Sequence, residues 1–158
     1  MDKKDALFVA HLRKNARATL TDISRRTGIP ISTLFDRLHQ LEERLVLKHT
    51  SLVDFAKLGF GCRASIVLKV GRERRDDLKA YLAKHPAVNS LLKINNGFDL
   101  MVEGIFIDVK ALEFMLEDLE QKFPIIEKHV YYIIEDIARE HFLADPQLVR
   151  LLEIPSLE

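Results

Sequence analysis

The chain has 158 residues, enough for one large domain or two small ones, with 47% apolar and 30% charged residues. This balance is typical of a soluble protein with a packed core. No apolar run approaches the roughly 18 residues that a membrane-spanning helix needs. The first five residues lead to no small-residue cleavage site, so we expect a cytoplasmic protein with no membrane partner. The single cysteine, Cys62, excludes a disulfide within the chain and is expected to be a small buried apolar residue.

The charge is unevenly divided, although the formal net charge of the whole chain is zero. Residues 1–50 hold ten Lys and Arg against six Asp and Glu, a net charge of +4, whereas residues 51–158 hold 14 against 18, a net charge of −4. This difference has the sign expected if only the N-terminal part meets phosphate groups. The alternative is a chance fluctuation in a mixed surface.

The first 50 residues predict three helices. Apolar spacing indicates a first helix over residues 4–14. The segment from Thr19 to Asp22 resembles a capping box that begins a second helix over residues 20–27. Gly28 ends this helix, because glycine tolerates the left-handed conformation of a sharp turn. A third helix begins near residues 30–32, and one apolar stripe runs along it: Leu34, Leu38, Leu41 and Leu45.

Beyond a boundary near residues 53–61 the pattern changes to short strands and helices. Strands are predicted over residues 64–70, 88–95, 100–106 and 126–134, and helices over residues 73–84 and from 108 to the proline at 124. Asn96-Gly97, a strong hairpin signal, joins the two middle strands. The resulting βαββαβ order is the ferredoxin-like unit, so the fold class is α+β. Asp145-Pro146 predicts the start of a short final helix near residues 147–152.

Both faces of the predicted sheet carry apolar or aromatic side chains. The last strand is expected to place one set on one face, namely Ile126, Val130, Tyr132 and Ile134, and a second set on the other, namely Tyr131 and Ile133. Two helices can cover only one face of a four-stranded sheet. We therefore expect a second copy of the chain to bury the other face.

Two short helices, a glycine turn and a leucine-striped third helix form a helix-turn-helix pattern. The stripe turns Ser32, Asp36 and Gln40 away from the core, with Thr33 nearby. Arg37 lies at the edge of the stripe, from where its guanidinium can reach a phosphate or a base edge. We predict that these five residues form a surface for double-stranded DNA. A three-helix packing or dimerisation module is the alternative.

Short segments spread over roughly residues 2–140 resemble the Lrp/AsnC regulators, also called feast/famine proteins. They are Asp5, Arg17, residues 23–29, Ser32-Thr33-Leu34, Arg37-Leu38, Leu41-Glu42-Glu43, Lys57-Leu58-Gly59, Ala64 and residues 96–99. The resemblance implies a sequence-specific, DNA-binding transcription regulator that forms homodimers or larger homo-oligomers. Taken with the patterns above, it gives a helix-turn-helix domain over residues 1–52, a linker over 53–61, a ferredoxin-like ligand-binding and dimerisation domain over 62–143, and a C-terminal helical tail over 144–158.

The resemblance also implies an amino-acid effector, because many members bind one near the hairpin loop at a subunit interface. It places this site at Asn96, Gly97 and Asp99, where the carboxylate of Asp99 can pair with an amino group. The alternative is that Asn96-Gly97 is only a tight turn and Asp99 a capping residue. Asp36 departs from the family pattern, since members often carry a basic residue there.

Other classes of protein fit the sequence less well. Sirohaem decarboxylases resemble the same two-domain fold, but residues 88–93 lack their characteristic His-Cys-Tyr-x-Arg stretch. We therefore expect no catalytic residues and no cofactor. The six histidines show no metal-ligand spacing, which predicts no metal site. Because the third helix is only weakly basic, an architectural DNA-coating protein or a metabolite sensor of little sequence specificity is the remaining alternative.

Overall fold

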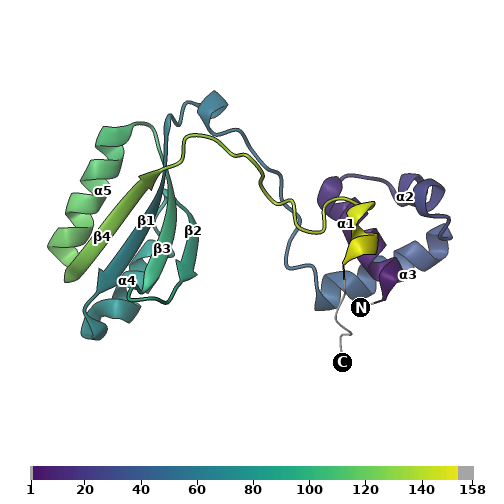
Figure 1. Ribbon diagram of the computed structural model, residues 1–158, viewed down its shortest axis with the longest axis horizontal. Coiled ribbons are helices and arrows are strands. Elements are labelled where there is room, and N and C mark those ends of the chain that lie inside the picture. The colour runs from purple at the N-terminus through teal and green to yellow at the C-terminus, as the bar shows by residue number, and fades with distance from the viewer. Residues whose placement is uncertain (1, 153–158) are drawn as a thin grey trace. The chain divides into compact units, whose positions relative to one another are not determined.

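The computed structural model describes residues 2–152, which form two compact units (Figure 1). The first unit contains the residues up to 52 and the segment 137–152, and the second is Val53–Asp136. The longer elements are α1 (Lys3–Lys14), α2 (Leu20–Thr27), α3 (Ile31–Arg44), β1 (Cys62–Val70), α4 (Arg75–Leu82), β2 (Val88–Lys93), β3 (Leu100–Phe106), α5 (Val109–Lys122) and β4 (Ile125–Tyr132). The described helices are all too short or too polar to cross a membrane.

Side-chain caps define where α1 and α2 of the first unit begin. The Asp5 N–H donates to the Asp2 carboxylate at 2.7 Å at the start of α1. The Asp22 N–H donates to the Thr19 hydroxyl oxygen at 3.1 Å at the start of α2. Gly28 ends α2 with a φ of +72°, in the left-handed region that glycine adopts without strain. The predicted cap at Thr19 and the glycine turn are therefore confirmed.

The helical unit has a small apolar core to which all three helices contribute. Its buried members are Phe8, Val9, Ile23, Ile29, Leu34 and Leu41. Leu38 packs against them from the same side of α3. Three of the four residues of the predicted stripe therefore hold α3 in place. Leu45 lies just after the end of α3 and is 38% exposed.

The chain returns from the second unit to pack on α1. One apolar cluster joins the two segments: Ala6, Ala10, Leu143 and Val149. The Arg13 guanidinium donates to the Phe142 carbonyl at 2.7 Å and pairs with the Glu140 carboxylate at 2.8 Å. The sequence prediction carried the second domain to residue 143, whereas these contacts group residues 137–143 with the helices. A 3-10 turn, η3 (Leu148–Leu151), lies where a final helix was expected.

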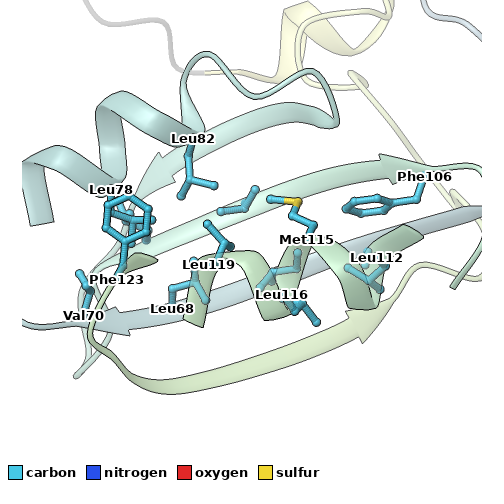
Figure 2. Packing of buried hydrophobic residues seen from close by; sticks show 14 of the residues in the cluster. Leu68, Val70, Leu78, Leu82, Phe106, Leu112, Met115, Leu116, Leu119 and Phe123 are labelled. Carbon is cyan, nitrogen blue, oxygen red and sulfur yellow. The ribbon is translucent and has the colours of Figure 1, made fainter. Parts of the chain in front are cut away.

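The second unit is a four-stranded antiparallel sheet with two helices on one face, and its βαββαβ order confirms the ferredoxin-like prediction. The strand order is β2-β3-β1-β4 (Figure 1). Leucines of α4 and α5 meet the strands in a single core, as Figure 2 shows. The buried strand residues of this core are Cys62, Ala64, Ile66, Leu68, Val70, Leu100, Val102 and Phe106.

The turn between β2 and β3 follows from its two residues. Asn96 and Gly97 have φ values of +62° and +88°. A type I′ turn needs a positive φ at both central positions, and its twist matches that of the flanking strands. The Ile94 N–H donates to the Asp99 carbonyl at 3.1 Å on either side of the turn. The predicted hairpin is confirmed.

An irregularity in the pairing of β4 changes which residues face the core. The register shifts where Val70 pairs with Ile125. Ile125 packs against the core together with Val130, whereas Ile126 is 63% exposed. Ile134 lies beyond the end of β4 and is 95% exposed. The prediction that Ile126 shares a face with Val130 was wrong, because a bulge shifts the alternation of side chains by one residue. The prediction for Ile134 was wrong for another reason, since the strand ends at Tyr132 and Ile134 belongs to neither face of the sheet.

The sheet face away from the helices is open and carries apolar side chains. Val67 on β1 lies opposite Met101 on β3 and His129 on β4. All three alternate with residues of the core, so they point to the open side. Leu92 and Tyr131 lie on the same side and are 54% and 59% exposed. The expectation that both faces carry apolar groups is confirmed.

A half-buried ion pair lies beside this apolar surface. The Arg63 guanidinium contacts Glu103 at 2.6 Å and Asp136 at 2.7 Å. Asn89 and Ser90 also donate hydrogen bonds to Glu103. Burial acts to raise the pKa of Glu103, but the hydrogen bonds from Asn89, Arg63 and Ser90 outweigh it and hold the pKa below its usual range. Arg63, Glu103 and Asp136 therefore satisfy one another within the chain.

Candidate DNA-binding surface and effector region

The helix α3 is held by buried side chains and presents its other side to solvent. Leu34 is fully buried, whereas Ser32, Asp36 and Gln40 are exposed and Thr33 is half-buried. The stripe of leucines causes this division, since residues on the opposite side of a helix must point outward. The structure thus places these four predicted residues on one accessible surface.

Two large apolar side chains share this surface and were missed by sequence reasoning. Ile31 is 48% exposed and Phe35 is 53% exposed. The ring of Phe35 packs edge-on against His39, with 4.8 Å between the ring centroids. The helical spacing of the sequence already indicated the exposure of Phe35. Phe35 follows Leu34 directly and therefore points about 100° away from the buried stripe.

Arg37 is engaged inside the helical unit. Its Nη1 contacts the carboxylate of Asp2 at 3.1 Å and also contacts that of Asp5. Burial acts to lower the pKa of Arg37, but the hydrogen bonds to Asp2 and Asp5 outweigh it and raise the pKa above its usual value. The guanidinium ties α3 to the start of α1. A DNA contact by Arg37 stays a prediction, and it would require this ion pair to open.

Basic side chains gather where α1 ends and α2 begins. A hollow of about 310 Å³ lies there, lined by His11, Lys14, Asn15, Arg17, Ala18, Asp22, Ile23 and Arg26, which we call the α1–α2 cleft. His11 is only 9% exposed. Burial, followed by the charges of Arg26 and Lys14, lowers the pKa of His11, which favours the neutral imidazole. Sequence reasoning missed this cleft because its residues meet only in the folded unit.

The predicted effector residues meet at the β2–β3 hairpin. Asn96 and Gly97 form its tip, and Asp99 lies at its base with a side chain that is 14% exposed. One carboxylate oxygen of Asp99 accepts the Val70 N–H at 3.0 Å, and the other contacts the Arg75 guanidinium at 2.6 Å. Both oxygens are thus engaged within the chain. The geometry therefore favours the alternative in which Asp99 is a capping residue over one in which it contacts an amino group of a ligand.

The cysteine and the possible metal-binding side chains form no further site among the described residues. Cys62 is 5% exposed in the core of the second unit, as predicted. Burial raises the pKa of its thiol, which keeps the sulfur uncharged. Among residues 2–152 no group of three or more His, Cys, Asp or Glu side chains is placed to hold a metal ion.

Known proteins are similar to this chain in sequence and in fold. A family model described as the IclR helix-turn-helix domain matches residues 9–49. The chain is 31% identical over 127 residues to the uncharacterized HTH-type transcriptional regulator PH0045 of Pyrococcus horikoshii, covering 78% of this chain and 82% of that protein.

The fold is similar to that of the transcriptional regulator NMB0573 of Neisseria meningitidis, solved as a complex with L-Met. The TM-score is 0.84, the identity is 25%, and the match covers 96% of this chain and 99% of the other. AsnC of E. coli shares the fold with a TM-score of 0.77 at 15% identity, over 88% of this chain and 95% of its own.

A three-helix module with an accessible third helix, followed by a ferredoxin-like domain, defines a helix-turn-helix transcription regulator. The chain belongs to the Lrp/AsnC family of these regulators. Its function is therefore the regulation of transcription through binding to DNA.

Proposed function

We propose that the protein regulates transcription as a homo-oligomer in which α3 of two copies enters the major groove at two half-sites. The solvent side of α3 carries this proposal. It presents polar Ser32, Asp36 and Gln40 together with exposed Phe35, while Leu34 anchors the opposite side. A helix fits the major groove, and each base pair presents a distinct pattern of donors, acceptors and methyl groups there.

The side chains of this surface suit particular base edges. Gln40 can donate and accept at an adenine, and Asp36 can accept from the amino group of a cytosine. Phe35 and Ile31 are suited to the methyl group of thymine, which is the apolar feature of the major groove. Ser32, at the start of the helix, is suited to a phosphate oxygen. We therefore propose a recognition site that contains A·T pairs.

The open sheet face supports the oligomeric part of the proposal. It exposes Leu92 and Tyr131 in a unit whose other face is already covered by α4 and α5. Pairing of this face about a two-fold axis removes both side chains from water. Two-fold symmetry places the half-sites about one helical turn apart, or a multiple of that distance. Residues 1–52 then bind DNA, and the oligomerisation surface lies on the strands of the second unit, within residues 62–136.

Selection of bound sequences from random DNA duplexes at about physiological salt tests this function. We expect a palindromic motif with thymine or adenine at fixed positions, because two identical α3 helices read symmetric half-sites. Recovery of sequences without any common motif would instead favour an architectural protein that coats DNA. The salt concentration must be stated, because the affinity for phosphate depends on it strongly.

We also propose an amino-acid effector that binds near the β2–β3 hairpin. Support comes from the neisserial regulator of similar fold, which was solved with L-Met. In this chain Asn96 and Gly97 form the accessible tip of the hairpin, whereas Asp99 supports it from inside. Calorimetric titration with a panel of amino acids that includes L-Met, at millimolar concentration, tests the proposal. Absence of heat with every amino acid would contradict it.

Substitution Asp99→Ala is expected to lower the free energy of unfolding by about 1–3 kcal/mol, because it leaves the Val70 N–H and the Arg75 guanidinium without their acceptor. Urea unfolding followed by circular dichroism measures the loss. Asp77→Ala is the control, since that carboxylate pairs with Arg74 on the surface and is 63% exposed. Wild-type stability of Asp99→Ala together with lost amino-acid binding would instead make Asp99 a direct ligand contact.

A further inference from the structure

Several cations of the helical unit pair with carboxylates. Arg13 pairs with Glu140, Arg25 lies 3.6 Å from Asp22, and Arg37 pairs with Asp2 and Asp5. In contrast, three cations of the α1–α2 cleft have no carboxylate partner among the described residues: Lys14, Arg17 and Arg26.

The three unpaired cations line one hollow together with the imidazole of His11. Asp22 is the single carboxylate of the lining, and it accepts a hydrogen bond from the Thr19 hydroxyl at 2.7 Å. Like charges brought together repel one another and oppose further protonation nearby, so Arg26 and Lys14 add to the larger effect of burial in lowering the pKa of His11. An anion in the hollow would relieve this repulsion.

The size and chemistry of the cleft suit a phosphate group. Its volume of about 310 Å³ admits a phosphodiester with its hydration water. Arg17 and Arg26 offer planar donor pairs that match phosphate oxygens, and Lys14 adds a point charge. The amide of Asn15 and the imidazole of His11 line the same hollow and supply neutral hydrogen-bonding groups.

The position of the cleft suits the backbone of DNA. In a helix-turn-helix the recognition helix enters the groove while the first helix crosses the backbone, and in related modules the loop between the first two helices contacts phosphates. The cleft is formed by residues at the end of α1 and in the following α2. Both helices belong to the same compact unit as α3 (Figure 1).

We propose that the α1–α2 cleft is a phosphate-binding site that takes a backbone phosphate of DNA when α3 lies in the groove. This inference rests on the proposed docking of α3. It assigns the main phosphate contact of the helical unit to Arg26, Arg17 and Lys14. Arg37 keeps its structural role beside Asp2 and Asp5.

The test uses the full-length chain and the selected duplex, with fluorescence anisotropy at several salt concentrations. Arg26→Ala is expected to weaken binding to all sequences and to lower the slope of log affinity against log salt by about 1. Arg25→Ala is the matched control. It removes the same charge from the neighbouring position of α2, but Arg25 lies outside the cleft. Arg26→Lys is expected to restore most of the slope, because it keeps the charge.

Equal slopes for wild type and Arg26→Ala would overturn the proposal, as would equal losses in Arg26→Ala and Arg25→Ala, since only a long-range charge effect would then remain. These failures differ from failure of the docking of α3. If α3 does not dock in the groove, Phe35→Ala would bind the duplex with the affinity of the wild type.

A second arm separates the DNA backbone from free anions. The imidazole signals of His11 are followed by NMR while inorganic phosphate, and then the duplex, is added to the wild-type protein. We expect micromolar duplex to shift the His11 signals. Inorganic phosphate should need a much higher concentration to produce the same shift. A response to inorganic phosphate without any response to saturating duplex would overturn the assignment to DNA.

Discussion

Replacement of Leu92 and Tyr131 by aspartate is expected to convert the protein into a folded monomer with greatly reduced affinity for its DNA site. Both side chains are more than half exposed on the open sheet face, so their loss costs the isolated unit little. In the oligomer, the new carboxylates would be buried without partners, and such burial costs several kcal/mol per charge. Each monomer then binds one half-site alone and loses the roughly 10²–10⁴-fold gain of bivalent binding.

Sedimentation equilibrium at micromolar concentration measures the oligomeric state, and anisotropy with the selected duplex measures the affinity. The matched control carries Val109→Asp and Phe114→Asp. These side chains of α5 are 50% and 59% exposed, and neither belongs to the strands that form the open face. We expect the control to remain at least dimeric. A wild-type protein that is monomeric at this concentration would contradict pairing through the sheet.

Adjacent residues of α3 are expected to give opposite results when each is replaced by alanine. Leu34 is fully buried in the core of the helical unit, and Leu34→Ala is expected to lower the stability of that unit by about 2–5 kcal/mol. Phe35 is 53% exposed, and Phe35→Ala is expected to leave stability nearly unchanged. It should weaken binding to the selected site by about 1–3 kcal/mol, the usual cost of one lost base contact.

Amide hydrogen exchange in α1–α3 reports the stability of the helical unit separately from the sheet unit. Replacing thymine by deoxyuridine in the duplex removes only the methyl group, which isolates the proposed contact of Phe35. The wild type should lose affinity on this replacement at one position of each half-site, and Phe35→Ala should not. Equal losses for the two proteins would show that Phe35 does not contact a thymine methyl group.

Some features of this protein depend mainly on local sequence and were predictable from it. The Asn96-Gly97 turn needs two positive φ values, which these residues tolerate better than others. The Thr19 cap and Gly28 set the ends of α2 through contacts within a few residues. The leucine stripe of α3 fixes which side is buried, so the outward positions of Ser32, Asp36 and Gln40 followed directly.

The candidate site was less predictable, because its charged groups find partners that are distant in the sequence. Arg37 pairs with Asp2, 35 residues away, and Asp99 accepts a hydrogen bond from Val70, 29 residues away. A long flexible side chain such as that of Arg37 can reach several surroundings, and the periodicity of a helix does not select among them. The α1–α2 cleft likewise combines residues of two helices that meet only after folding.

The sequence by itself determined the order of the elements, the hairpin turn and the buried side of α3, because each depends on backbone preference or on helical and strand periodicity. The tertiary structure alone decided the pairing of strands, and with it the bulge that brings Ile125 rather than Ile126 into the core. It alone also brought residues 137–152 back onto α1, enclosed Arg37 between two carboxylates and left the cations of the α1–α2 cleft unpaired. These features depend on packing and electrostatic contacts between distant segments, which no local pattern encodes.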